Sequence, residues 1–490
     1  MYPYGHTPVY TPPQIVKMTE TIDTTQELGT RNMGALLWKY ALPAVVTQII
    51  ATVYNLVDSI FLGHAENGAL ILAALAITLP IMNIIHAFGS LVGAGAGARM
   101  SIVLGRKDVR WAEKILGNSM WLTFFFGILF VSAGYLFMDP ILAMFGASEI
   151  TMRLAHEYMS IVLPGMFLTT LTFNLSGLIR ASGYATKSMW IQVSGAVMNI
   201  ILDAIFIVGL GWGIKGGAWA TTISMAFSAT LAVMHFVSPK SFIHYKRHCW
   251  EPKMYIVKNI LAIGISPFSM NVASCAVVAL LNTQLIRFGG DYAVSAYGVV
   301  NRIAFLVFMV LMGICQGMQP IAGYNYGAGL NHRLKEIYLL SLKWNVGTGI
   351  LGMLLALFVP RTMVMMMTSE EELISIAIPA MRFLLVMAPL IGFTVTNSQF
   401  FQSIDKPWIA IVTSLSRQVI FLIPLMYIVP AFMVRHGWSG LTGVWLSMTI
   451  SDVCGALLSG ILLYTQLKVF RPGYVPPHRK PRKERGPKSN

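Results

Sequence analysis

The chain has 490 residues, of which 56% are hydrophobic and only 11% charged, and its formal net charge is +15. A soluble chain carries about 25% charged residues, so this composition excludes a soluble enzyme and indicates a helical membrane protein. The four cysteines form no CxxC pair, so neither a disulfide framework nor a zinc site is predicted.

Long apolar runs fill the chain after a Pro- and Thr-rich leader, residues 1–33, which we expect to be disordered at least to about Glu27. The runs are continuous rather than alternating, which disfavours a transmembrane barrel. A bilayer crossing takes about 20 apolar residues. By this measure the chain holds twelve predicted spans, at residues 36–62, 69–93, 115–138, 154–177, 189–210, 218–237, 257–286, 292–317, 335–359, 373–401, 408–432 and 441–466.

The basic residues set the predicted orientation, because cytoplasmic loops are enriched in Lys and Arg. With the N-terminus inside, the inner loops hold most of these residues and each outer loop holds at most one. The one acidic cluster, 370–372, then lies outside. We therefore predict a multi-pass protein of the plasma membrane (the bacterial inner membrane), with both termini cytoplasmic. The basic tail would rest on anionic headgroups, so no nucleic-acid partner is needed.

An internal repeat divides the chain. The segments GAGARMSIVLGRKD (95–108) and GMQPIAGYNYGAGL (317–330) share a pattern, and Pro43 precedes Asp58 by the same interval as Pro267 precedes Asn282. Six spans per repeat is an even number, so the halves enter the membrane in the same direction. We predict an all-α protein of two pseudo-symmetric six-helix lobes around a central cleft. The domains are a leader (1–33), an N-lobe (34–238), an inter-lobe loop (239–255), a C-lobe (256–467) and a tail (468–490).

Polar groups at one depth of the N-lobe form the predicted cation site. A carboxylate inside a span costs about 2.5–3.5 kcal/mol to insert, so Asp58 is a functional candidate. Asn199 and Asp203 share one helix face because they are four residues apart. The full predicted set is Asp58, Tyr158, Asn199, Asp203, Thr221 and Thr222. Such oxygens suit Na⁺, or a proton shared between two acids. The Na⁺ ligands would be Asp58, Asn199, Asp203 and Thr221. The alternative is a set of structural or hydrated polar groups without a transport role.

The C-lobe does not repeat the acids, since Asn282 stands opposite Asp58. It carries charges within or near its spans instead, and these are predicted to form buried ion pairs between helices or to contact substrate: Arg302, Arg382, Arg417 and Asp452. His86 and His156 are interpreted as packed or interfacial. The chain lacks a Walker-type phosphate loop, so no ATP motor and no enzyme activity are predicted.

Several segments resemble the multidrug and toxic compound extrusion (MATE) transporters over about residues 30–468, and look closest to the bacterial DinF-like and MepA-like exporters. The segments are NLVDSIFLG (55–63), GAGARMSIVLGRKD (95–108), NLSGLIRASGYATKSMW (174–190), MNIILDAIFIVGLGWGIKGGAWATTIS (198–224) and MGICQGMQPIAGYNYGAG (312–329). The resemblance implies a V-shaped bundle of two lobes with a cation site at Asp58, Tyr158, Asn199, Asp203 and Thr221, or Thr222 in the last place. The NorM-like branch has an acid in its seventh span, which this sequence lacks.

The resulting hypothesis is a secondary antiporter that exports hydrophobic organic cations in exchange for H⁺ or Na⁺ by alternating access. It would act as a monomer in the lipid bilayer and need no cofactor. A flippase for lipid-linked saccharides, which would have a large cationic cavity, is the alternative transporter. A scaffold without transport is the third reading.

Overall fold

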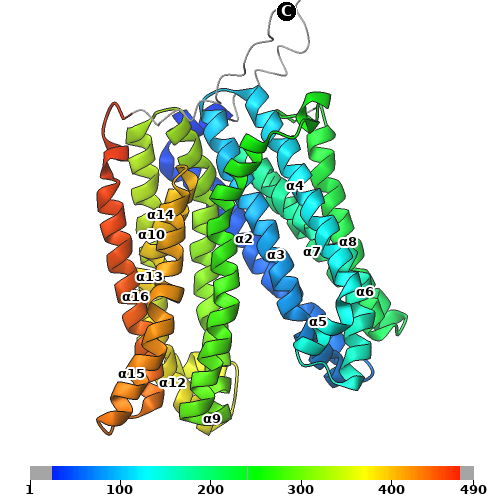
Figure 1. Cartoon of the computed structure of the whole chain (residues 1–490), viewed down its shortest axis with the longest axis vertical. Coiled ribbons are helices and arrows are strands. Elements are labelled where there is room, and N and C mark those ends of the chain that lie inside the picture. Colours follow the sequence, from blue (N-terminus) through cyan, green and yellow to red (C-terminus); the bar gives the residue numbers. More distant parts are fainter. Residues whose placement is uncertain (1–24, 240, 475–490) are drawn as a thin grey trace, which may run out of the picture.

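The structure is a computed structural model that describes residues 25–239 and 241–474. Two helical bundles lie side by side, and the described residues include no strand (Figure 1). The N-lobe contains α2 (Met33–Gly63), α3 (Gly68–Gly105), α4 (Val109–Leu136), α5 (Met138–Met144), α6 (Glu149–Ala181), α7 (Ala185–Asp203), η1 (Ala204–Gly209) and α8 (Gly213–Val237). A short η2 (Arg247–Trp250) leads to the C-lobe, which contains α9 (Met254–Gly327), α10 (Asn331–Phe358), α11 (Pro360–Met365), α12 (Glu371–Leu385), α13 (Ala388–Ser403), α14 (Pro407–Leu415), η3 (Ser416–Leu422), α15 (Ile423–Arg435), α16 (Gly440–Thr465) and η4 (Leu467–Phe470).

The twelve predicted spans are all present in the described residues. Ten helical segments are long and apolar enough to cross a membrane, and α12 with α13 forms one more span that is bent by 45°. The 74-residue α9 supplies two of the twelve, because its backbone reverses at Gly290, where φ is 65°. Only glycine adopts that conformation without a steric penalty, so Gly290 divides the helix into two membrane-length arms.

Helices α2 and α3 and the two arms of α9 form most of the contact between the lobes. A Cβ atom added to Gly105 would lie 2.0 Å from the carbonyl oxygen of Tyr324, and one added to Gly327 would lie 2.0 Å from the carbonyl oxygen of Ile102. The two contacts are reciprocal: each glycine of one repeat meets the backbone of the other. They lie within the repeated segments 95–108 and 317–330, so the repeat builds the closed end of the molecule.

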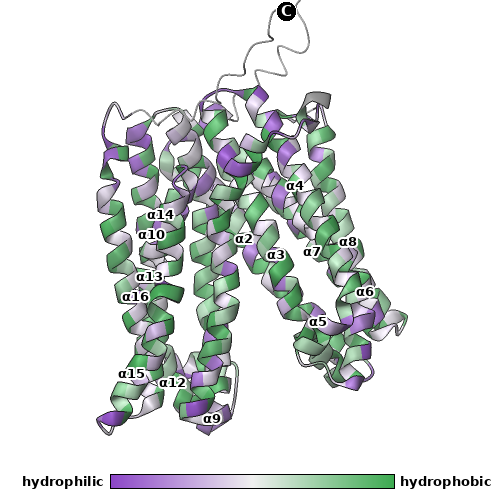
Figure 2. Ribbon diagram, viewed as in Figure 1, coloured by the Kyte–Doolittle hydropathy of each residue, from purple (hydrophilic) through white to green (hydrophobic). Residues whose placement is uncertain are grey.

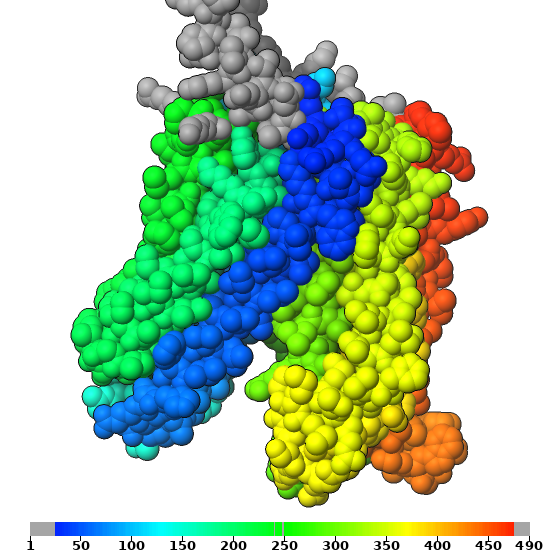
Figure 3. Space-filling view, turned by 180° about the vertical axis from the view of Figure 1, so that it is seen from behind, coloured from blue at the N-terminus to red at the C-terminus, as the bar shows by residue number. Residues whose placement is uncertain are grey.

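The lobes separate toward the opposite end, where a cleft opens between α2 and α3 on one side and the C-lobe on the other (Figure 3). The closed end, which we call the basic end, holds the loops 106–108, 182–184, 238–239 with 241–253, 328–330 and 404–406. The other end is the open end. Hydrophilic residues concentrate near both ends, while hydrophobic residues dominate the middle of the helices (Figure 2). Phe125 and Ile128 of α4 are exposed there, as lipid-facing side chains would be.

The loop between the lobes packs onto the N-lobe. Lys246 forms an ion pair with the buried Glu113 of α4 at 2.6 Å. The indole of Trp121 donates to the carbonyl of Trp250 at 3.0 Å, and the backbone N–H of Lys253 donates to Asn118 at 2.7 Å. The connection is therefore anchored to one lobe up to its last residue before α9.

The expected disorder of the leader falls mainly on residues 1–24, which lie outside the described residues, as does most of the basic tail. Residues 25–30 are helical. Leu28 is fully buried, and Asn325 of the C-lobe donates to its carbonyl at 2.9 Å. These contacts order the end of the leader, so the prediction of disorder does not hold from residue 25.

Candidate functional site

Helix α2 carries Asp58 near the open end. The helix begins after Asn32, whose side chain accepts hydrogen bonds from the N–H groups of Gly34 and Ala35. Pro43 interrupts its backbone hydrogen-bonding pattern, and the hydroxyl of Thr47 donates to the Pro43 carbonyl at 2.8 Å. Asp58 lies beyond this weak point and is half-buried. A bend of α2 at Pro43 would therefore move the part of the helix that carries Asp58 without disturbing the basic end.

Helix α7 carries the second acid at its last residue. Asp203 is fully buried, and Asn199 lies one turn earlier on the same face, also buried. The backbone widens into the π-helical segment η1 directly after Asp203. Such segments are rare and occur often at functional sites.

Four buried oxygen atoms in this region lack a hydrogen-bond donor: Asp58 Oδ1, Asn199 Oδ1 and both carboxyl oxygens of Asp203. The carboxyl groups of Asp58 and Asp203 are close enough to hydrogen-bond to each other when one is protonated. Burying an unpaired polar group costs several kcal/mol, and burying two neighbouring carboxylates costs more. A proton or a small cation between these oxygens would remove this cost.

Tyr158 and Thr221 complete the same cluster. Tyr158 is buried on α6 and its hydroxyl contacts that of Thr221. The amide of Asn199 donates to the Thr221 hydroxyl at 3.4 Å. Thr222 faces elsewhere: its hydroxyl donates to the carbonyl of Ile161 on α6 at 3.0 Å. Of the two threonines predicted for the site, the structure therefore brings only Thr221 to the acids.

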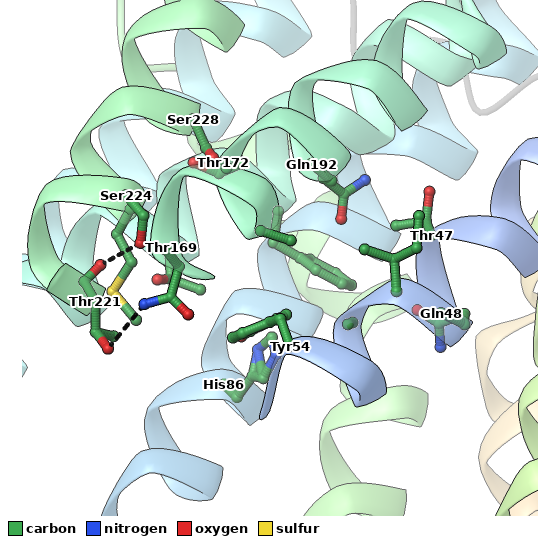
Figure 4. Close-up of a pocket in the computed structure, with 17 residues that line it drawn as sticks. Thr47, Gln48, Tyr54, His86, Thr169, Thr172, Gln192, Thr221, Ser224 and Ser228 are labelled. Atoms are coloured by element: carbon green, nitrogen blue, oxygen red, sulfur yellow. Dashed lines mark hydrogen bonds between the residues drawn. The ribbon is translucent and has the colours of Figure 1, made fainter. Parts of the chain in front are cut away.

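A cavity of about 180 Å³ extends from Asn199 and Thr221 into the N-lobe (Figure 4). Its lining includes residues that the sequence reasoning did not assign to the site: Thr47, Gln48, Tyr54, Thr169, Thr172, Gln192, Ser224 and Ser228. The sequence carried a signal for part of this set, because Thr221, Ser224 and Ser228 follow the helical spacing of one face. Figure 4 shows His86 at this cavity, and its ring lies edge-on to Phe173 at 5.7 Å. His156 is half exposed at the open end, 3.6 Å from Asp139.

The C-lobe charges divide into one pair and two separate arginines. Arg417, in η3, contacts Asp452 of α16 at 3.2 Å, as the predicted ion pair requires. Arg302 and Arg382 are exposed and have no ion-pair partner among the described residues, so the prediction of buried pairs is wrong for them. Because both side chains are exposed, neither needs a buried counter-charge. Asn282 is half-buried on α9, and its side chain makes no hydrogen bond within the described part of the chain.

No group of three or more His, Cys, Asp or Glu side chains occurs in residues 25–239 and 241–474 that would hold a metal ion. The cluster of two acids, one amide and two hydroxyls fits a monovalent cation or a proton better than a divalent metal, because each divalent site usually needs more charged ligands.

The chain was compared with known proteins. The family model MatE matches residues 43–205 and 263–428, one segment in each lobe. The multidrug export protein MepA of Staphylococcus aureus (strain MRSA252) is 25% identical over 426 residues, covering 87% of this chain and 92% of MepA. MepA of Staphylococcus haemolyticus (strain JCSC1435) is 24% identical over the same lengths.

Solved structures share the fold. A crystal structure of MATE in the bent conformation superimposes with a TM-score of 0.84 at 23% identity, covering 92% of this chain and 97% of that one. The outward-facing conformation of a multidrug resistance MATE family transporter of the MOP superfamily gives a TM-score of 0.82 at 24% identity, covering 92% and 98%.

Proposed function

The chain belongs to the MatE family of transporters, and on this basis we propose that it exports hydrophobic organic cations in exchange for H⁺ or Na⁺. The unpartnered oxygens of Asp58, Asn199 and Asp203 carry the proposal. They form a buried site that favours binding of one positive charge, which is what an antiporter needs to couple an ion gradient to transport.

The proposed cycle follows from the position of this site. The Lys and Arg content of the basic end supports a cytoplasmic position for it, and in this orientation the cleft of Figure 3 faces outward. A proton or Na⁺ entering from outside binds between Asp58 and Asp203 and removes their mutual repulsion. α2 then repacks against α7 beyond Pro43, which displaces an organic cation from the cleft. The lobes then close at the open end and separate at the basic end, which releases the ion into the cytoplasm.

Proteoliposomes test this cycle. We expect purified protein to move a fluorescent organic cation when either a pH or a Na⁺ gradient is imposed, and the effective gradient identifies the ion. Asp58→Asn and Asp203→Asn should each abolish gradient-driven transport while the protein stays monodisperse. Asp139→Asn is the matched control, because Asp139 is an exposed acid near the same end. Full transport by Asp58→Asn or Asp203→Asn contradicts the coupling role.

The flippase alternative predicts a strongly cationic cavity. The C-lobe has a cavity whose described lining residues include a single cation, Arg417, where a pyrophosphate would need several. This favours export of drug-like molecules over export of a lipid pyrophosphate.

A further inference from the structure

The C-lobe contains a cavity that is the counterpart of the cavity in the N-lobe. It has a volume of about 360 Å³ and is lined by both arms of α9, α12, α13, η3 and α16. These helices occupy the same places in the second repeat as α2, α3, α6, α7 and α8 do in the first. Pockets that hold organic ligands have volumes of about 300–1,000 Å³. The C-lobe cavity reaches this range, whereas the N-lobe cavity, at about 180 Å³, does not.

Hydrogen-bond donors concentrate in the C-lobe cavity. Arg417 lines it with 21% of its side chain exposed. Gln418 lies beside Arg417 and accepts a hydrogen bond from Ser274 at 3.0 Å, which leaves its amide N–H groups to donate. Tyr297 adds a phenol close to Arg417. The described residues that line the cavity include no Asp or Glu.

Asp452 holds Arg417 in place without using up its donors. Asp452 is only 5% exposed and contacts a single guanidinium nitrogen, Nη1, at 3.2 Å. No other side-chain hydrogen bond of Arg417 occurs within the described residues. A neutral pair lowers the cost of keeping an arginine inside the membrane. The remaining N–H groups of the planar guanidinium can bind a carboxylate in a bidentate manner.

The cavity extends to the boundary between the lobes. Asn271 lines it and donates across that boundary to Ser90 of α3 at 3.5 Å. Phe305 and Phe308 supply an apolar wall of the size that an aromatic ring system would cover. A molecule entering the cleft can therefore place a ring against these side chains and an acidic group against Arg417.

We propose that the C-lobe cavity binds the carboxylate of amphipathic aromatic compounds, with Arg417 as the residue that selects for this group. The inference rests on the proposed export function and names a class of its substrates: zwitterions and acids with a flat apolar body, in addition to simple cations.

Two dyes with one ring system test the proposal: rhodamine B, which has a free carboxylate, and its ethyl ester. Binding to purified protein in detergent is measured by fluorescence anisotropy with no ion gradient. The variants are Arg417→Gln combined with Asp452→Asn, which removes the pair without leaving a buried charge, and Arg417→Lys, which keeps the charge but loses the planar fork. Arg302→Gln is the control, because Arg302 lies on the same lobe and does not line the cavity.

We expect the double variant to weaken binding of the free acid about tenfold or more and binding of the ester less than threefold. Arg417→Lys should weaken binding of the acid severalfold, and it carries the test if the double variant aggregates. Arg302→Gln should change neither dye. Equal weakening of both dyes, no weakening of either, or no binding of the acid by the unmodified protein overturns the proposal. If both dyes bind but neither is transported in proteoliposomes, the export function fails while the carboxylate site stands.

Discussion

Gly105→Ala should push the protein toward a state that is open at the basic end. Its new Cβ would lie 2.0 Å from the backbone oxygen of Tyr324, well inside the 3.0 Å limit that real Cβ contacts respect. Because the obstacle is backbone, α3 and α9 must move apart. Overpacking of this kind costs about 1–3 kcal/mol, which shifts a two-state equilibrium about 5- to 150-fold. The strain falls between the lobes and not within either one, so each lobe stays folded.

Alkylation of a buried cysteine measures this shift. Ser101 is buried in the same contact, with its Cβ 2.8 Å from the position of a Cβ on Gly323. In a Ser101→Cys protein whose Cys275 and Cys454 are replaced by Ser, a maleimide should react slowly unless the lobes separate. We expect Gly105→Ala to raise the labelling rate about 5- to 150-fold, in proportion to the shift in the equilibrium.

Gly347→Ala provides the control, because a Cβ there meets nothing within 4 Å. Unchanged labelling in Gly105→Ala, or an equal rise in Gly347→Ala, would refute the reasoning.

The remaining predictions concern four polar contacts. Asp405→Asn removes the partner of Arg99, a buried α3 residue that pairs with Asp405 across the lobes at 2.9 Å; labelling at position 101 should rise, because breaking a buried pair costs about 3–5 kcal/mol in the closed state. A rate equal to that of the parent would argue against an inter-lobe latch. Thr221→Val should impair ion-coupled transport, because it removes the hydroxyl that Asn199 contacts. Thr222→Val should keep transport and lose about 1 kcal/mol of stability, because it loses the hydrogen bond to Ile161. The reverse pattern in dye transport and thermal melting would show that the wrong threonine was placed in the site. Glu113→Gln removes the ion pair with Lys246, so the melting temperature should fall and the loop between the lobes should be digested faster by protease. Unaltered digestion would mean that the ion pair does not hold the loop.

The fold was largely predictable because membrane burial leaves a strong signal. Twelve apolar runs gave twelve spans, and the repeat of residues 95–108 at 317–330 gave the pairing of the lobes. The break between two spans at residues 287–291 was also predicted, and the backbone reverses there at Gly290. The π-helical segment after Asp203 was not predicted, because it has no distinctive composition. Its position depends on tertiary packing that single residues do not encode.

The site was predictable in outline. Depth and spacing predicted that Asp58, Asn199, Asp203, Tyr158 and Thr221 would come together, as they do. The sequence did not separate Thr221 from Thr222, because adjacent residues share a depth and differ only in direction. It also did not place Arg302 and Arg382. A mid-span arginine can face a partner, a cavity or the outer surface, and the choice depends on helix rotation, which is set by neighbouring helices.

The anchored loop between the lobes makes the transport motion unequal at its two ends. Among the residues that the structure describes, the chain passes from one lobe to the other once, at the basic end, and its contacts with α4 extend as far as Lys253. At this end, the backbone near Met254, where α9 begins, is the part of the connection that can change conformation. At the far end no peptide bond joins the lobes. The lobes should therefore separate widely at the open end. At the basic end, their separation should be limited by the length of the backbone that joins them.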